Sequence, residues 1–403
     1  MELVIKIDRT ELNYLKAGII FWPVIAYAPF FFTQWVNPAL RIGCFTLLSI
    51  YLFFSSKRYS KNDVFLFFLL LTLSAILVSS NSAGQQGLVS VGNYCLTLFF
   101  GWGLCRHLTL SRARIPILLG LYVRFVYLIA ICSLLSLLYL LIIGELDLFG
   151  FKSDKYSQLV TPFGVHFKRQ VGPVTVYRSF FYFVEAAHIG IFYAANIIIV
   201  APLLKHKAAS FKKVNFLGGL LSMSMTFYVV LFVLYGYKKV SSIYSFIAVL
   251  LGVVLLIYLG QIIDIVSYSS SDDRSERFLM FFIVMADANI SQFLFGHGVS
   301  FETGFDKAFN SGFTLSIYET GIVGTALQMI ILYILSPSFI LLIFFMLAAA
   351  VVDPIHMPLF LFLMIITAHL LKNEKANLKR SFNRMNKDLI KKYGGLPEVT
   401  VTK

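Results

Sequence analysis

Long apolar runs, separated by short polar or basic segments, follow one another along almost the whole chain. Most approach the roughly 20 residues that a helix needs to cross the hydrocarbon core of a bilayer. In chain order the runs are approximately Ala17–Val36, Ala39–Ser56, Val64–Ser80, Gly87–Cys105, Ile115–Ile143, Phe180–Leu204, Val214–Tyr237, Ile243–Ile263, Phe313–Leu335, Phe339–Val352 and Ile355–Leu371. The pattern predicts an all-α polytopic membrane protein with about 10–12 transmembrane helices, forming one integral membrane domain over residues 1–403.

Lysine and arginine positions predict the orientation of the chain, because connections on the cytoplasmic side carry an excess of basic residues. Basic clusters follow the second and fourth runs, and residues 372–403 hold nine basic residues against three acids. We therefore place the N-terminus and the basic tail, residues 372–403, in the cytoplasm. Two long connections, residues 144–177 and 264–312, then become the first and second periplasmic loops.

The assignment of sides depends on how many times two of the apolar segments cross the membrane. Val214–Tyr237 must contribute an even number of crossings, so we read it as two short helices turning near Ser222–Ser224, or as a re-entrant hairpin. A competing topology fuses Phe339–Leu371 into one broken crossing and turns the second long loop inward. Residues 353–358, with their two prolines, favour a turn between two short helices instead.

Composition narrows the class of protein further. Of the 403 residues, 58% are hydrophobic and 13% charged, and the mean hydropathy is +0.80, outside the range of soluble globular proteins. The net charge of +14 could suggest a nucleic-acid partner, but its distribution follows membrane topology, so we expect none. The four cysteines lie in or beside apolar runs, so we expect neither a disulfide framework nor a metal site.

The stretch Arg178–His188 places an arginine, a carboxylate and an imidazole at the start of an otherwise apolar run. If the run is helical from Phe180, then Arg178, Tyr182 and Glu185 share one face, and His188 lies beside Glu185 one turn further on. A buried carboxylate costs several kcal/mol unless it is paired, protonated or hydrated. This helix is therefore expected to line a polar cavity.

Four arginines in the two long loops are candidates for binding phosphate. Arg169 and Arg178 lie at the end of the first loop, and Arg274 and Arg277 lie within the second. Guanidinium groups bind phosphate oxygens in bidentate fashion and stay charged in any surroundings, so together they could hold a pyrophosphate. The plainer alternative is that each arginine extends to lipid headgroups.

Acid–base chemistry could be carried by Glu185, His188, His297 or Glu319. Transfer of a sugar to a hydroxyl needs a base, and a partly buried carboxylate or imidazole suits that role. Either carboxylate could instead pair with an arginine to hold helices together, and His297, between two glycines, could be a turn residue. The chain has no DxD-type motif and no metal-ligand spacing, so we expect metal-independent chemistry without a cofactor.

Several features occur in a fixed order along the chain. They are Arg178-x6-Glu185, an apolar Ser-rich hairpin, Arg277, Phe295-Gly-His-Gly298, and Asn310 before Ile317-Tyr-Glu-Thr-Gly-Ile-Val-Gly324. In this order they resemble the O-antigen polymerase family of bacterial inner-membrane proteins, relatives of the O-antigen ligases. The resemblance covers about Leu146–Leu335, whereas the first five runs match only as hydrophobic spans.

The resemblance implies a GT-C-like glycosyltransferase that joins undecaprenyl-pyrophosphate-linked oligosaccharide repeat units at the periplasmic face of the bacterial inner membrane. Its partners would be the lipid-linked oligosaccharide, membrane lipids and a polysaccharide chain-length regulator. Arg178 and Arg277 match the loop arginines of the family and would bind pyrophosphate. Asn310 matches the second position of a His-Asn pair, and Phe309 stands where the histidine would be.

Two other functions stay open at this point. An O-antigen ligase would attach finished polysaccharide to a lipid A core, but the ligases rely on the histidine that Phe309 replaces here. A flippase for the same lipid-linked sugars would have short loops and cationic helices around a central channel. The long loops and the acids near one face favour the polymerase, with Glu185, His297 and Glu319 as candidate bases.

Overall fold

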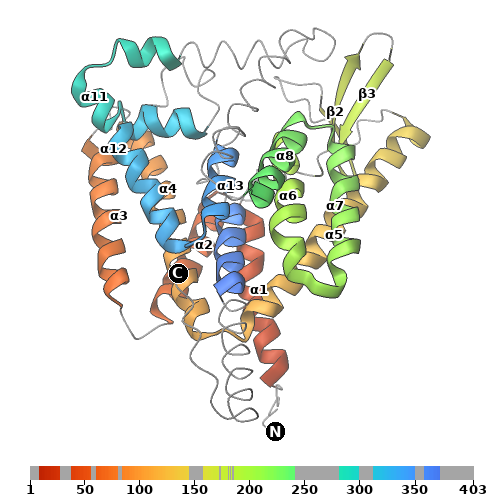
Figure 1. Ribbon diagram of the computed structural model, residues 1–403, viewed down its shortest axis with the longest axis horizontal. Helices are drawn as coiled ribbons and strands as arrows, with labels where there is room; N and C mark the ends of the chain where they lie inside the picture. The colour runs from red at the N-terminus through yellow and green to blue at the C-terminus, as the bar shows by residue number, and fades with distance from the viewer. Residues whose placement is uncertain are drawn as a thin grey trace, which may run out of the picture.

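A computed structural model of the chain describes residues 9–27, 38–55, 60–79, 84–144, 158–171, 174–179, 181, 183, 186–240, 281–298, 312–349 and 358–372. Helices run side by side through most of the molecule, and a small β-sheet stands at one end of them (Figure 1). The sheet was not predicted, so the expectation of an all-α protein is correct only for the bundle.

The helices follow the predicted apolar runs closely. They are α1 (Arg9–Tyr27), α2 (Pro38–Phe54), α3 (Lys61–Ser79), α4 (Gly84–Leu110), α5 (Arg114–Ile143), α6 (Ala186–Ala195), the π-helix η2 (Asn196–Val200), the 3₁₀ helix η3 (Ala201–Lys207), α7 (Ala208–Ser222), α8 (Met225–Val240), α11 (Ile290–Phe295), α12 (Gly312–Leu335), α13 (Phe339–Ala349) and a further helix, Pro358–Lys372. The predicted run Ile243–Ile263 and the basic tail beyond Lys372 lie outside the described residues.

Four helices of the described chain are long and apolar enough to cross a membrane: Lys61–Ser79, Arg114–Ile143, His188–Lys205 and Leu315–Leu335. Shorter apolar helices accompany them. The chain is therefore a predominantly helical protein with membrane-spanning character, and the larger number of 10–12 crossings stays a prediction.

The share of each helix that is buried distinguishes peripheral helices from central ones. Only 22% of the apolar window in α3 is buried inside the protein, and its phenylalanines Phe65, Phe67 and Phe68 face outward. In contrast, 78% of the window in His188–Lys205 is buried. Since an apolar face this large needs a non-aqueous partner, α3 is suited to face lipid, whereas α6 and its continuation form the centre of the bundle.

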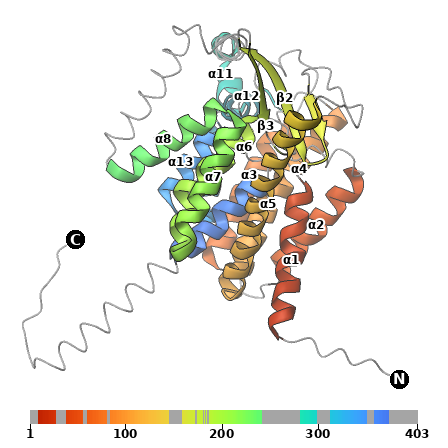
Figure 2. The same cartoon turned by 90° about the vertical axis from the view of Figure 1, so that its right-hand side faces the viewer.

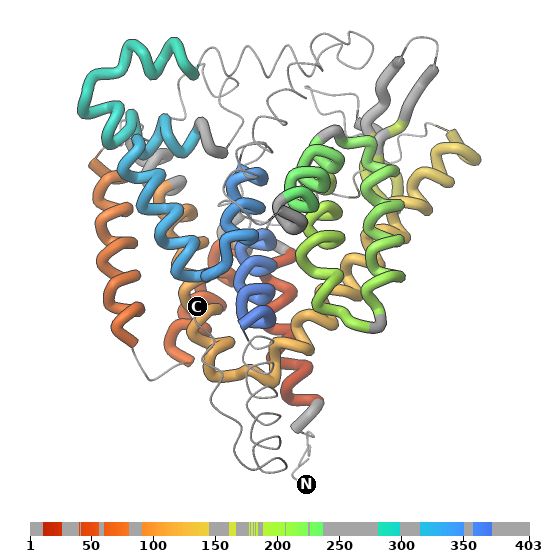
Figure 3. The backbone as a smooth tube through the Cα atoms, viewed as in Figure 1, coloured from red at the N-terminus to blue at the C-terminus, as the bar shows by residue number. Residues whose placement is uncertain are grey.

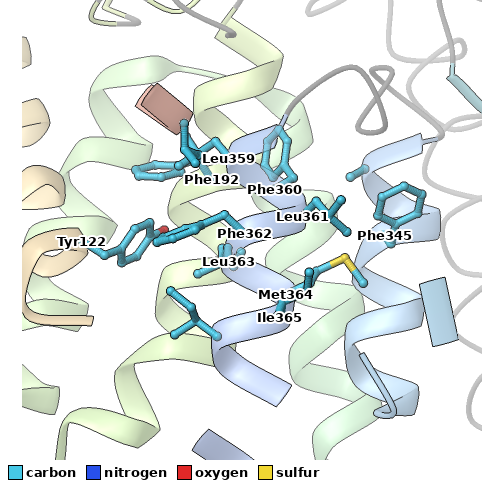
Figure 4. Packing of buried hydrophobic residues seen from close by; sticks show 14 of the residues in the cluster. Tyr122, Phe192, Phe345, Leu359, Phe360, Leu361, Phe362, Leu363, Met364 and Ile365 are labelled. Carbon is cyan, nitrogen blue, oxygen red and sulfur yellow. The ribbon is translucent and has the colours of Figure 1, made fainter. Parts of the chain in front are cut away.

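The helix Pro358–Lys372 shares this central position. Its side chains from Leu359 to Ile366 are all buried, and they pack among residues of α5, α6 and α13 (Figure 4). The Phe344 and Phe360 rings, from α13 and this helix, lie 6.0 Å apart. One continuous helix would separate these positions by about 24 Å, so α13 and this helix are two helices packed against each other. This supports the prediction of two short helices, whereas the predicted turn between them, residues 350–357, lies outside the described residues.

The predicted turn near Ser222–Ser224 is also confirmed. Helix α7 ends at Ser222, Met223 takes a left-handed conformation with φ of 44°, and α8 begins at Met225. Both helices pack against α6. A Cβ on Gly190 of α6 would lie 2.7 Å from Ser224 Oγ, so the turn approaches the start of α6 closely. Val214–Tyr237 therefore forms two short helices on the central one.

Hydrogen bonds gather several helix ends at one end of the bundle. The Ser55 hydroxyl, just after α2, bonds to Nδ1 of His107 in α4, and Arg114 at the start of α5 donates to Nε2 of the same ring. Sγ of Cys105 lies 3.6 Å from Nε2 of His369. We call this the basic end, and the opposite end, where the sheet stands, the sheet end. The grouping agrees with the predicted grouping of the basic connections.

A buried ion pair between Asp63 and Arg106 links α3 to α4 at the basic end. Asp63 Oδ1 lies 3.4 Å from Nη1 of Arg106 and accepts a 2.7 Å hydrogen bond from the Trp102 indole. Its Oδ2 accepts from the backbone N–H and the hydroxyl of Ser60, while the N–H of Asp63 donates back to Ser60 Oγ. This reciprocal capping starts α3. The guanidinium also lies 4.7 Å from the centre of the Phe53 ring.

The small sheet consists of β1 (Gln158–Thr161), β2 (Gly164–Val171) and β3 (Val174–Ser179), all antiparallel in that order. It stands at the end of α5 (Figure 2) and belongs to the stretch predicted as the first loop. Valines, threonine and aromatic residues in this stretch favour strands, and the sequence Gly172-Pro173 favours a turn between β2 and β3.

The helix predicted over Phe180–Leu204 needs correction, because the helix in the structure begins later. Arg178 lies in β3, and α6 begins at Ala186, so Arg178 is not part of the helix, while Tyr182 and Glu185 lie outside the described residues. Phe181 has a positive φ of 52°, and its carbonyl accepts a hydrogen bond from the N–H of Val165. Phe181 therefore continues the pairing with the sheet. Aromatic residues suit this pairing as well as they suit an apolar helix.

We predict that Asp63→Asn destabilises the protein by on the order of 3 kcal/mol, because it leaves the buried Arg106 guanidinium without its counter-charge. Asparagine keeps an acceptor for Trp102, but its NH₂ replaces the oxygen that accepts from Ser60, so the expected loss includes both the charge and the cap of α3. Thermal unfolding of the purified protein in detergent measures the effect. Lys61→Gln, an exposed change in the same turn, is the control. Equal unfolding temperatures for the two variants would show that the ion pair does not stabilise the bundle.

Candidate functional site

Helix α12 is interrupted within the stretch that the sequence singled out around Glu319. Gly321 has φ of 66° and ψ of −175°, which is not helical. Glycine adopts a positive φ without the steric cost that a Cβ imposes. The part before Gly321 lies across the sheet end, and the part after it runs down the bundle (Figure 3). The sequence analysis did not predict an interruption at Gly321.

The segment Gly296-His297-Gly298, which follows α11, docks against this break. The N–H of His297 donates to the carbonyl of Tyr318 (2.8 Å), and the N–H of Gly298 donates to the carbonyl of Glu319 (3.0 Å). These carbonyls end a helical segment and would otherwise lack partners. Two candidate catalytic residues far apart in the sequence, His297 and Glu319, are thereby brought together.

Glycine is required on both sides of this contact. A Cβ on Gly296 would lie 2.2 Å from the carbonyl oxygen of Glu319, and one on Gly321 would lie 2.3 Å from the backbone of Leu294. Gly296 also has a positive φ of 83°. The two backbones therefore approach as closely as their atoms allow, which fixes the position of His297 relative to α12.

The His297 ring is held by stacking. It lies parallel to the Tyr318 ring, with a 7° angle between the planes and 4.6 Å between the ring centres. The ring is half-buried, and its Nδ1 has no hydrogen-bond partner among the residues that the structure describes. A histidine so placed has a fixed ring and an uncommitted nitrogen, which is what a proton acceptor needs.

The start of α11 is fixed as well. Asn289 Oδ1 accepts from the N–H of Gln292 (2.8 Å), and Gln292 Oε1 accepts from the N–H of Asn289 (3.1 Å). This reciprocal cap satisfies backbone donors that a helix start leaves unpaired. Because α11 is short, a fixed start also fixes where the chain leaves it, directly before His297.

Below the break, α12 carries a buried polar cluster that the sequence analysis did not single out. Thr320 donates to the carbonyl of Ser316, and Thr325 donates to the carbonyl of Gly321. The buried amide of Gln328 lies 3.3 Å from Thr320 Oγ1. Two threonines on either side of a glycine, and a glutamine further along the same helix, were the available signal. They supply hydrogen bonds where the regular helical pattern is broken.

The second group of candidates lies on the sheet. In the register of β2 and β3, Arg178 pairs with Phe167 and Arg169 pairs with Val176. Side chains two residues apart along a strand lie on the same face, so the two arginine positions are diagonal neighbours on one face. The prediction that Arg169 and Arg178 come together is supported at the level of the backbone.

Buried polar residues attach the other face of this sheet to α5. Thr161 donates to the carbonyl of Gly164, so its oxygen must accept from Ser136, and Ser136 in turn accepts from Nε2–H of His166. Ser179 in β3 donates to the carbonyl of Ser133. His166 and Ser179 are paired neighbours and directly adjoin Phe167 and Arg178. The anchor therefore fixes the strand positions next to the arginines.

His188 lies in α6, buried, and its Nδ1 has no hydrogen-bond partner among the described residues. In Figure 1, α13 lies between α6, the helix of His188, and α12, the helix of Glu319. The remaining candidates, Tyr182, Glu185, Arg274, Arg277 and Asn310, lie outside the described residues.

Comparison with protein-family models, with curated proteins and with solved structures found no match. The geometry of the site itself therefore carries the functional argument.

We predict that Gly296→Ala loosens the contact between α11 and α12, because alanine would combine a strained positive φ with a clash against the carbonyl of Glu319. The expected cost is on the order of 1–3 kcal/mol. Faster amide hydrogen exchange of residues 290–298 is the readout. Gly120→Ala, in α5 with open space around its Cα, is the control. Unchanged exchange at residues 290–298 would contradict the described docking.

The His166 anchor predicts a pH dependence of stability. Burial lowers the pKa of His166 to about 4, from an ordinary value of 6.5, so the folded protein binds this proton later than the unfolded chain. Stability is then complete above pH 6.5 and falls as the pH drops toward 4, with a loss of about 2 kcal/mol at pH 5. His166→Gln, which keeps an N–H donor, should remove this part of the dependence.

The measurement is the unfolding temperature of both proteins between pH 7.5 and 4.5, and the difference between their two profiles isolates His166. Parallel profiles would show that its protonation does not oppose folding.

Proposed function

We propose that this protein is a metal-independent glycosyltransferase of the O-antigen polymerase type, which extends a polysaccharide on undecaprenyl pyrophosphate. The observation that carries the proposal is the docking of Gly296-His297-Gly298 at the break in α12, where the N–H of His297 bonds to the carbonyl of Tyr318 and the N–H of Gly298 to the carbonyl of Glu319. It lies at the same end of the bundle as the sheet that bears Arg169 and Arg178 (Figure 1). Acid–base groups and phosphate-binding groups at one end of a membrane protein suit a lipid-pyrophosphate substrate.

In the proposed reaction the growing chain leaves its carrier and moves onto the non-reducing end of a new lipid-linked repeat unit. An acceptor hydroxyl attacks the anomeric carbon of the donor sugar, and the bond from that carbon to the pyrophosphate oxygen breaks. The hydroxyl proton passes to a base, and undecaprenyl pyrophosphate leaves with the bonding electrons. Each step balances without a metal, a nucleotide or a redox partner.

His297 and Glu319 are the described candidates for the base. The His297 ring is fixed by Tyr318, and its Nδ1 is buried without a hydrogen-bond partner among the described residues, so His297 would take the proton once the acceptor hydroxyl reaches this nitrogen. Glu319, one residue after Tyr318, is half-buried and can orient the acceptor or the imidazolium that forms. Fixed groups of this kind need no reorganisation as charge develops.

Arg169 and Arg178 are proposed to hold the departing pyrophosphate. Their positions on one face of neighbouring strands would let two guanidinium groups approach the same ligand. Guanidinium stays charged near a membrane surface and binds phosphate oxygens in pairs. The buried anchor of His166 and Ser136 gives these positions a rigid base.

The centre of the bundle favours an enzyme over a flippase. A transporter of lipid-linked sugars needs a polar passage between the helices. Among the described residues, the space between α5, α6, α13 and the helix Pro358–Lys372 is filled by large apolar side chains such as Phe192, Phe360 and Phe362 (Figure 4). The polar candidates instead gather at the sheet end.

The test is elongation by purified protein of its lipid-pyrophosphate-linked repeat unit, without metal or nucleotide, with the products resolved by size. Wild type should give a ladder of longer lipid-linked chains. We expect Glu319→Gln and His297→Gln each to lower the rate by about 10²–10⁴-fold, the usual contribution of a general acid or base. Arg178→Ala should raise the KM for the donor. Asp287→Asn, which changes an exposed carboxylate near α11, is the control.

The outcomes test the assignment of the base and the polymerase activity separately. A ladder that persists at wild-type rate in both the Glu319 and the His297 variants would overturn the assignment of the base. No ladder from folded wild-type protein with the matched substrate would overturn the polymerase. A deletion strain then discriminates the ligase, since loss of a polymerase leaves single repeat units on the lipid core and loss of a ligase leaves none.

A further inference from the structure

Residues 281–295, the segment before His297, are apolar on two faces. We call them the apolar arm. The inner face packs on the first part of α12, where Phe281 and Tyr318 are buried together against Val284 and Met285 of the arm and Leu315 and Ile317 of α12. This contact uses one side of the arm, and large apolar side chains on the other side are exposed.

The outer face carries large apolar side chains that are exposed. Ile290 is 80% exposed and Phe282 is 63% exposed, and Ile283, Phe293, Leu294 and Phe295 are also exposed. The arm has one charged residue, Asp287, and no lysine or arginine. A contiguous apolar surface of this kind is unfavourable in water and marks a site of interaction.

The position of the arm indicates what covers this surface. The arm lies across the sheet end, above the ends of α3 and α12 (Figure 1, Figure 3). The exposed surface of α3 extends to Val78 near its end, and α12 exposes Ile322 just after the break. Because α3 and α12 pack side by side and α11 packs on α12, the outer face of the arm continues the surface that is suited to lipid.

We propose that the apolar arm is an interfacial membrane-binding element, whose outer face enters the boundary between lipid headgroups and acyl chains at the sheet end. Short apolar helices lying across the ends of spanning helices bind at this depth. Through the backbone contact of His297 with Tyr318, the arm also sets the depth of His297 relative to the bilayer. The proposal does not rest on glycosyl transfer.

The composition of the outer face favours lipid over a protein partner. The exposed side chains are phenylalanine, isoleucine and leucine, and they continue the exposed apolar surfaces of α3 and α12, which are suited to lipid. Without basic residues, the arm would bind through apolar insertion and not through attraction to anionic headgroups. Its insertion should therefore be the same in neutral and anionic vesicles.

The experiment is site-directed spin labelling in vesicles. Cys44, Cys95, Cys105 and Cys132 are replaced by alanine, and single cysteines are placed at 282, 290, 293 and, as the control, 287. The protein is reconstituted in phosphatidylcholine, with and without phosphatidylglycerol. Collision with oxygen, which concentrates in acyl chains, is compared with collision with a water-soluble nickel chelate.

We expect oxygen to exceed the nickel chelate by at least about threefold at 282, 290 and 293, with the order reversed at 287, because an interfacial helix presents one face to acyl chains. The two lipid compositions should give the same values. High nickel collision at 290 and 293 would place the outer face in water and overturn the proposal. Protection from both reagents would show cover by protein, from this chain or a second copy, and would also overturn it.

A second measurement covers the case in which the cysteine-free protein does not fold. Phe293→p-benzoylphenylalanine in the otherwise native chain is irradiated in the same vesicles, and adducts are identified by mass. A phospholipid adduct is expected, and an adduct within or between chains would overturn the proposal. Neither readout uses enzymatic activity, so failure here is distinct from failure of the polymerase assay.

Discussion

The arrangement at the sheet end depends on the hydrogen bonds that close the break in α12. A helix interrupted in apolar surroundings leaves carbonyls without partners, and each costs free energy unless a donor meets it. The N–H groups of His297 and Gly298 meet the carbonyls of Tyr318 and Glu319. The break and the docked segment therefore stabilise each other. A site built on this contact is positioned by backbone, which has little freedom to shift.

In the small sheet, too, buried polar groups are hydrogen-bonded, here by side chains in place of backbone groups. Its inner face is attached through a chain of hydrogen bonds from His166 through Ser136 and Thr161 to a carbonyl. Each hydroxyl in that chain has one proton to donate, and this fixes the direction of every bond in it. The bundle centre is apolar around Phe360 and Phe362. A second buried chain of hydrogen bonds, from Tyr122 through Asn196 to Asn215, links α5, η2 and α7 within the bundle.

The sequence predicted features that local composition determines. Apolar length predicted the helices, and a helix-breaking pattern predicted the turn at Met223 and the separation of α13 from the helix Pro358–Lys372. The break at Gly321 was missed because a glycine pair in an apolar run suits either close packing or an interruption. The outcome depends on whether a distant segment supplies donors to Tyr318 and Glu319, and local sequence does not contain that information.

In the candidate site, too, local sequence predicted some features and contacts with distant segments determined others. His297 and Glu319 were singled out by residue type, yet only the folded chain brings them together. Arg178 was identified as a candidate but assigned to the wrong element, since Phe180-Phe-Tyr-Phe suits an apolar helix and a strand equally well. Pairing with β2, which begins with Gly164, decided in favour of the strand. Sequence therefore identified the chemical groups, and long-range pairing determined their geometry.

The location of the site constrains the substrate that it can serve. A lipid-linked pyrophosphate has a polyprenyl tail that stays among acyl chains and a saccharide that stays in water, so its reactive bond lies at the boundary between them. The proposed membrane-binding arm and the crosswise part of α12 would hold His297 at this boundary. A soluble acceptor alone would not require that depth. The coupling of His297 to the arm thus links the proposed chemistry to a membrane-bound substrate.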